Sequence, residues 1–127
     1  MPTDIRIIHS NDFIKATPEG HLDFEETKRL LREIASASAA LGDHEIIIDT
    51  RNAQSEMSIT DLWNLAAELD KLFSDSSRKT AILCPFDRFD NAGVFALFAQ
   101  NRGFRVRAFI SFEDAINWLL QMGPTRD

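Results

Sequence analysis

The chain has 127 residues, and 14 Lys and Arg against 20 Asp and Glu give it a formal net charge of −6. This length predicts one domain over residues 1–127, and the acidic balance argues against binding to the phosphate backbone of nucleic acids. The apolar runs are far shorter than the roughly 20 residues that a membrane-spanning helix needs. The single cysteine, Cys84, permits no internal disulfide, and no signal peptide opens the chain, so we expect a cytoplasmic protein.

Two short strands are predicted at the start of the chain, over residues 5–9 and 12–17, with a polar turn between them. A second turn is predicted at residues 18–20, because Gly20 can adopt a positive φ. A helix follows over residues 23–42, where apolar side chains recur with helical spacing between a capping aspartate and a terminal glycine.

The rest of the chain alternates between strands and helices. Two apolar runs, 45–49 and 80–84, point side chains to both faces and therefore predict central strands that are covered on both sides. Residues 104–110 alternate arginine with apolar side chains, which is typical of a strand at the edge of a sheet. The helices are predicted at about 59–74, at 90–102, and from 111 to the residue before Gly123.

The predicted order of these elements is ββαβαβαβα. Strands that are separated by helices favour parallel pairing through right-handed crossovers, whereas two strands joined by a short turn pair in an antiparallel way. The sequence therefore predicts an α/β fold, in which a mixed five-stranded sheet is flanked by four helices.

Ser58 stands where the second helix should begin. Its hydroxyl can accept a hydrogen bond from the amide of Asp61, whose carboxylate can return one, while Met57 and Leu62 occupy the hydrophobic positions around such a cap. This pattern explains Ser58 by structure alone. The alternative is a regulatory serine, because a phosphate would add a charge of about −1.5 to −2 at this helix end and change the surface offered to a partner.

Asp49, Arg51 and Cys84 lie at or just after the carboxyl ends of the predicted central strands, where ligands bind in open α/β sheets. Their side chains could take part in binding or catalysis. Asp49 is a candidate catalytic acid, metal ligand or partner contact, and Arg51 is a candidate contact for a partner or ligand. The alternative is that Asp49 caps a turn or pairs with Arg51 in the loop. The segment after Cys84 does not form the phosphate-binding loop, closed by an arginine, that phosphatase-like chemistry of a thiol would need. This favours a buried, hydrophobic cysteine. Metal-ligand spacings, glycine-rich phosphate loops and serine nucleophile elbows are missing from the sequence, so we expect no metal, no cofactor and no catalytic residue.

The segment AGVFALFA, residues 92–99, is apolar all round its predicted helix. Phe95 and Leu97 lie about 160° apart on a helix of 3.6 residues per turn, so one of them should leave the core. It would then contact a second copy of the chain, another protein or an apolar ligand. The alternative is a helix buried between the sheet and a neighbour. Trp118, off the apolar stripe of the last helix, is a weaker candidate for a contact.

Three stretches of the sequence share features with one known family. GHLDF at 20–24 resembles a Gly-x-Leu-Asp signature, and EIIIDTRNA at 45–53 resembles an apolar strand, acid and loop before a regulatory helix. RGFRVRAFISFEDAINWLL at 102–120 resembles a closing strand and helix. Together they resemble the STAS domains, which are named for sulfate transporters and anti-sigma-factor antagonists, and in particular their SpoIIAA-like branch.

The resemblance implies a bacterial regulatory domain that binds other proteins and has no catalytic activity of its own. In the anti-sigma-factor antagonists, a serine at the start of the second long helix is phosphorylated by a partner kinase, and Ser58 is the position that matches best. The family's Asp-Ser-Ser-Gly is replaced here by SEMSITDL, residues 55–62, without the glycine. Structural relatives of the SpoIIAA-like branch include lipid-carrying CRAL-TRIO domains, which makes a small apolar ligand the rival expectation.

Overall fold

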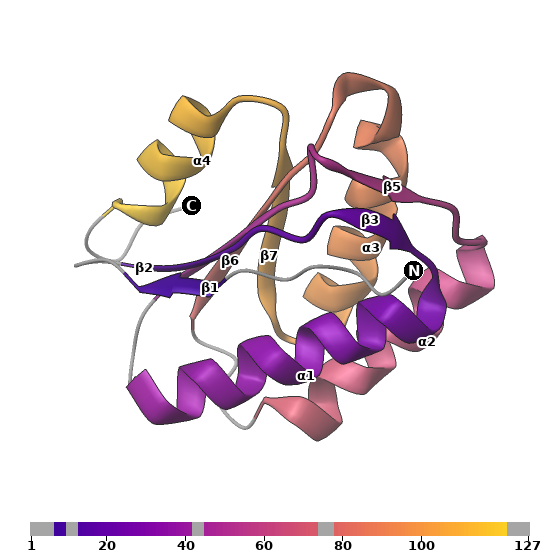
Figure 1. Cartoon of the computed structure of the whole chain (residues 1–127), viewed down its shortest axis with the longest axis horizontal. Helices are drawn as coiled ribbons and strands as arrows, with labels where there is room; N and C mark the ends of the chain where they lie inside the picture. Colours follow the sequence, from indigo (N-terminus) through magenta and orange to yellow (C-terminus); the bar gives the residue numbers. More distant parts are fainter. Residues whose placement is uncertain (1–6, 10–12, 42–44, 74–77, 122–127) are drawn as a thin grey trace.

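The structure is a computed structural model that describes residues 7–9, 13–41, 45–73 and 78–121 (Figure 1). Its main sheet has five strands in the order β1-β2-β4-β6-β7, and β1 is antiparallel to β2 while the other neighbours are parallel. The predicted mixed α/β fold is therefore confirmed. The strands are β1 (Ile7–His9), β2 (Phe13–Ala16), β4 (Glu45–Asp49), β6 (Lys79–Leu83) and β7 (Arg105–Phe109).

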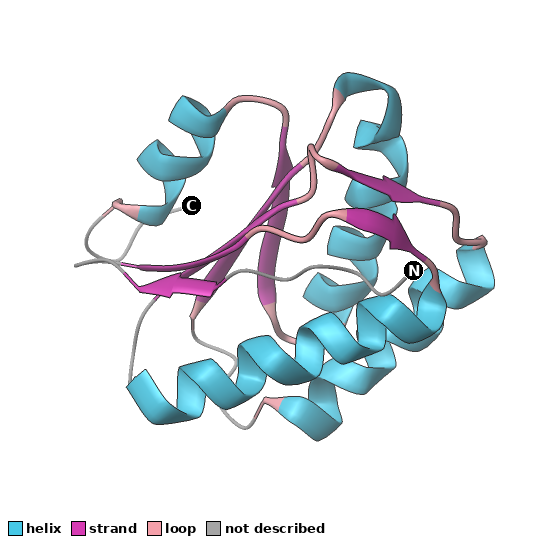
Figure 2. Cartoon of the chain, in the orientation of Figure 1, coloured by secondary structure: helices cyan, strands magenta, loops and turns pink. Residues whose placement is uncertain are grey.

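Four α-helices cover the two faces of this sheet (Figure 2). The chain crosses the sheet in one direction from β2 to β7, so the right-handed crossovers place α1, α2 and α3 on the same face. The last helix, α4, follows the final strand and packs on the opposite face. The helices are α1 (Phe24–Leu41), α2 (Ile59–Leu72), α3 (Phe89–Asn101) and α4 (Phe112–Leu119), and a 3₁₀ helix, η1 (Phe86–Arg88), precedes α3.

The isoleucines of β4 supply both halves of the core. Side chains alternate along a strand, so Ile46 and Ile48 join the larger cluster under α1, α2 and α3. Ile47 points the other way and packs with Ala115 and Leu119 of α4. All three isoleucines are buried, which confirms that this strand is central and covered on both sides.

A second, two-stranded sheet was not predicted. Gly20 takes a φ of 94° as expected, but it begins the strand β3 (Gly20–Leu22) where a turn was predicted. This strand pairs in parallel with β5 (Ala53–Ser55), with Leu22 opposite Ser55. The prediction failed because strands of three residues are too short to show an alternating pattern, and their pairing joins distant parts of the chain. In Figure 1 the two strands lie beside the main sheet rather than within it.

The last helix is shorter than predicted. It ends at Leu119, whereas the sequence predicted a helix up to the residue before Gly123. Lys79, the first residue of β6, donates from Nζ to the carbonyl oxygens of Trp118 and Gln121, at 2.9 and 3.1 Å. The carbonyl of Trp118 also accepts from the amide of Gln121, so Lys79 adds a charged donor at a helix end where carbonyls lack helical partners. The predicted turn at residues 10–12 lies outside the described residues.

Trp118 lies between α4 and the sheet and is half-buried. Its ring centroid is 5.6 Å from that of Phe109, and the Nζ atom of Lys79 is 5.6 Å from the same ring. Packing therefore explains this tryptophan, and its contact with a partner stays a prediction.

Candidate functional site

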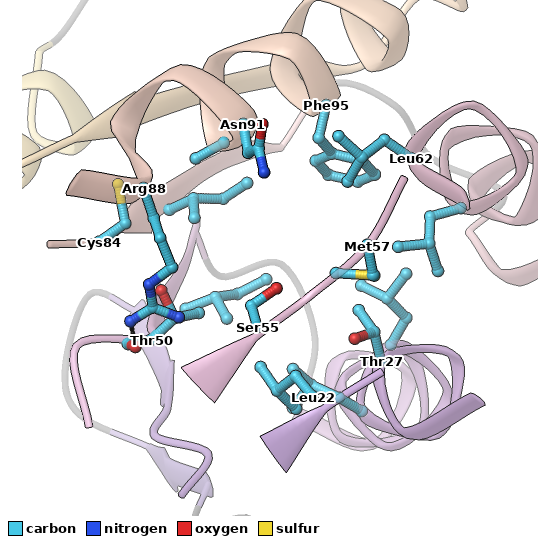
Figure 3. Close-up of a pocket in the computed structure, with 16 residues that line it drawn as sticks. Leu22, Thr27, Thr50, Ser55, Met57, Leu62, Cys84, Arg88, Asn91 and Phe95 are labelled. Carbon is cyan, nitrogen blue, oxygen red and sulfur yellow. Dashed lines mark hydrogen bonds between the residues drawn. The ribbon is translucent and has the colours of Figure 1, made fainter. Parts of the chain in front are cut away.

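An apolar cavity of about 100 Å³ lies between the main sheet and the helices α1, α2 and α3 (Figure 3). Leu22 of β3 and Ser55 of β5 line it, so the unpredicted second sheet forms one of its walls. The apolar part of the wall includes Leu30, Leu31, Ile48, Leu62, Ile82 and Phe95. Because the chain crosses the sheet in one direction, no crevice opens between strands, and the cavity lies under the helices beside the carboxyl ends of β4 and β6.

Polar side chains also line the cavity: Thr27, Thr50, Ser55, Arg88 and Asn91. In Figure 3, Arg88 and Thr50 lie together on one side, opposite Met57 and Leu62, and Asn91 also lines the space. Arg88 donates from Nη2 to the carbonyl oxygen of Thr50 at 3.0 Å and forms no ion pair with any of the described residues. Its positive charge is therefore not matched by a carboxylate within the described ranges.

Cys84 lines the same cavity, but its thiol is not activated. The side chain is buried, and its Sγ donates weakly to the carbonyl oxygen of Phe109 at 3.6 Å. Burial raises the pKa of the Cys84 thiol, and the nearby positive charge of Arg88 opposes this only in part. A thiol with a raised pKa is protonated at neutral pH and is a poor nucleophile.

Asp49 and Arg51 form a bidentate ion pair. Nε and Nη2 of Arg51 donate to the two oxygens of Asp49 at 3.0 and 2.9 Å, and the Arg51 amide adds a third bond at 3.1 Å. Burial raises the pKa of Asp49, but these hydrogen bonds and the positive charge outweigh it and hold the pKa below its usual range. Side-chain alternation places Asp49 on the face of Ile47, away from the cavity, so this pair and Cys84 do not form one site.

Ser58 begins α2 as predicted. Its Oγ accepts from the amide of Asp61 at 3.1 Å, and the Asp61 carboxylate accepts from the amide of Ser58 at 3.2 Å. Ser58 is exposed, so its hydroxyl combines a structural role with access from solvent.

Replacing Ser58 by alanine should lower the free energy of unfolding by about 1 kcal/mol, because the helix loses its capping oxygen. Urea denaturation followed by circular dichroism would measure the change. The matched control is Ser58→Asn, which keeps a capping oxygen and should differ from wild type by only a few tenths of a kcal/mol. Equal stability of the alanine and asparagine variants would contradict a structural role for the cap.

Two large apolar side chains follow Ser58 on the outer face of α2. Ile59 is 56% exposed and Trp63 is 52% exposed, one helical turn apart. The Trp63 ring lies edge-on to Phe98 of α3, with 5.2 Å between the ring centroids. We call Ser58, Ile59 and Trp63 the α2 surface. Ile59 and Trp63 were not predicted as contact residues from the sequence. The signal that could have indicated them is their position outside the buried apolar stripe of α2, which is Leu62, Leu65, Ala66 and Leu69.

The expected division between Phe95 and Leu97 is found in α3. Phe95 packs against the core and lines the cavity, whereas Leu97 is 53% exposed. One of the two has therefore left the core, as the sequence predicted.

The described part of the chain contains no group of three His, Cys, Asp or Glu side chains that could hold a metal ion. Among the same residues, no helix combines the length and the apolar character that crossing a bilayer would take.

The fold is SpoIIAA-like. An uncharacterized protein from the DUF3478 family, with a SpoIIAA-like fold and from Shewanella loihica PV-4, superposes with a TM-score of 0.58 at 20% identity over 92% of this chain and 93% of its own. An anti-sigma factor antagonist from Mycobacterium paratuberculosis gives a TM-score of 0.61 at 15% identity, over 94% and 95% of the two chains. The anti-sigma factor antagonist SpoIIAA in its unphosphorylated form gives 0.55 at 14% identity, over 94% and 100%.

These comparisons confirm the predicted resemblance at the level of the fold. No family model and no curated protein matches the sequence.

Proposed function

We propose that the protein is a non-enzymatic, cytoplasmic regulatory domain that binds another protein through the α2 surface. The observation that carries this proposal is the exposed hydroxyl of Ser58 at the start of α2, beside the exposed side chains of Ile59 and Trp63. Two solved structures with the same fold are of anti-sigma factor antagonists, and one is described as unphosphorylated. Both names support a protein partner, and the second supports a phosphorylation switch at Ser58.

The geometry suits such a switch. A phosphate on Ser58 would add a charge of about −1.5 to −2 next to the apolar side chains that a partner would cover. The N-terminus of α2 tolerates negative charge, so the fold would be kept. A partner would have to desolvate the new charge in order to bury Ile59 and Trp63, which weakens binding.

The test is affinity capture from cells of the source organism with wild type, Ile59→Glu and Ser58→Asp as baits. We expect a protein that wild type retains and both variants lose at least tenfold, because each variant places a negative charge in the contact. Neither change should disturb the fold, since acidic residues are favourable at the start of a helix.

Two matched controls separate the surface from general effects of charge. Leu120→Glu changes a leucine that is 48% exposed at the end of α4, on the other side of the sheet, and should retain the partner. Ser58→Asn keeps a neutral capping side chain and should also retain it. A partner that binds all five proteins equally would show that the α2 surface is not its contact.

The partner could also be a second copy of the chain, and Leu97 on α3 is the exposed residue that would test this. Light scattering on wild type and Leu97→Glu separates the two cases. A wild-type dimer that the variant dissociates would assign the contact to self-association through α3, and monomers in both would leave another protein as the partner.

The second candidate function is sensing or carrying a small apolar ligand. The observation that favours it is the cavity of about 100 Å³, whose lining is mostly apolar, with Leu and Ile side chains, Met57 and Phe95. Pockets that are lined mainly by apolar side chains with a few polar groups are typical binding sites for small molecules.

A further inference from the structure

We infer that the cavity binds a small amphiphilic anion, with a short aliphatic tail among the apolar walls and a carboxylate on Arg88. The inference rests on the second candidate function above and names the ligand class and the residues that would select it.

The size of the cavity limits the tail. An apolar cavity of about 150 Å³ holds one benzene ring, so about 100 Å³ accepts a tail of roughly four to five carbons. Most of its lining is apolar, including Leu30, Leu62 and Ile82, and the hydroxyl side chains Thr27, Thr50 and Ser55 are uncharged. Among the described residues that line the cavity only Arg88 carries a charge, so the carboxylate of a ligand is expected on the side of Arg88 and Asn91.

Phe95 would set the length of the tail. Its side chain lines this cavity and also a second cavity of about 30 Å³, which Phe104 and Val106 help to line. Leu31 and Ile48 also line both cavities, and Phe95 has the largest side chain of the three. A smaller residue at this position would join them and admit a longer chain.

Arg88 supplies the complementary charge. Among the described residues, the Arg88 side chain donates only to the carbonyl oxygen of Thr50, so its planar guanidinium keeps further donors for a carboxylate. Asn91 lines the cavity on the same helix end and offers an amide as a second donor. Neither Asp87 nor Asp90, the acidic neighbours of Arg88 in the chain, lines the cavity, so neither fills the place of the ligand.

The experiment is an NMR titration at pH 7 with straight-chain carboxylates of four to eight carbons and with the alcohols of equal length. Methyl resonances of Leu62 and Ile82 report on the cavity, because both side chains line it. We expect the carboxylate of about five carbons to bind at least tenfold more tightly than the alcohol, as hydrogen bonds to charged groups imply. Arg88→Gln should remove that difference, whereas Arg102→Gln, which changes an arginine that does not line the cavity, should keep it.

Phe95→Leu provides a test that does not depend on the charge. It should move the preferred carboxylate toward chains about two carbons longer, because the two cavities join. Circular dichroism confirms that each variant is folded before it is titrated.

The outcomes distinguish failure of the anion site from failure of the second candidate function, an apolar ligand in the cavity. Equal affinity for carboxylates and alcohols, or an unchanged preference in folded Arg88→Gln, would overturn the anion site while leaving an apolar ligand in place. No shift of the Leu62 and Ile82 methyl groups with either series would overturn both.

Discussion

Replacing Lys79 by methionine is expected to lower the free energy of unfolding by about 3 kcal/mol. Lys79 is only 3% exposed, and its Nζ donates to two carbonyl oxygens at the end of α4. Methionine would fill most of the space of the lysine stem but would leave those carbonyls without their charged donor. Each hydrogen bond to a charged group contributes about 1.5–3 kcal/mol, so the loss should be large.

Urea denaturation followed by tryptophan fluorescence measures this effect. In a Trp63→Phe background Trp118 is the single reporter, and it lies beside Lys79. The matched control is Lys71→Met, which changes a lysine whose side chain is 72% exposed on α2. That variant should stay within about 0.5 kcal/mol of its background. Equal stability of the two variants would show that Lys79 does not hold α4 on the sheet.

Replacing Asp49 by asparagine is expected to cost about 2 kcal/mol at pH 7, and the cost should shrink as the pH falls. The folded pKa of Asp49 is lowered, so the carboxylate stabilises the fold above its unfolded pKa of about 4. This contribution is lost as the pH falls through the folded pKa, because the acid is then protonated in both states. The expected loss of unfolding free energy is smaller than for breaking a fully buried ion pair, because the Arg51 side chain is 44% exposed.

The measurement is urea denaturation of wild type and Asp49→Asn between pH 7 and pH 2. The matched control is Asp70→Asn, which removes the pair with Arg102, where the Asp70 side chain is 49% exposed. An exposed pair of this kind contributes about 0–1 kcal/mol, so the control should change stability little at any pH. A difference between wild type and Asp49→Asn that does not depend on pH would contradict the ion pair.

The two candidate sites use different faces of α2. Leu62 and Leu65 face inward and line the cavity, whereas Ile59 and Trp63 face outward. Met57, next to Ser58, also lines the cavity. The chain segment that begins α2 therefore contributes to both the proposed partner surface and the proposed ligand site.

Sequence alone determined the features that depend on neighbours along the chain. The three isoleucines of β4 predicted a strand covered on both faces, because side chains alternate along a strand. Ser58 and Asp61 predicted the start of α2, because the capping pattern spans four consecutive residues. Helical geometry separated Phe95 from Leu97 and so predicted that one of them would be exposed.

Only the tertiary structure decided the features that join distant residues. The pairing of β3 with β5 brings Leu22 beside Ser55 and closes a wall of the cavity. Folding also brings Lys79 to the end of α4 and places Arg88 against Thr50. No local pattern encodes these contacts, because each depends on how helices and strands pack once the core is buried. The candidate ligand site therefore forms only in the packed fold, whereas the Ser58 cap could be predicted from the sequence.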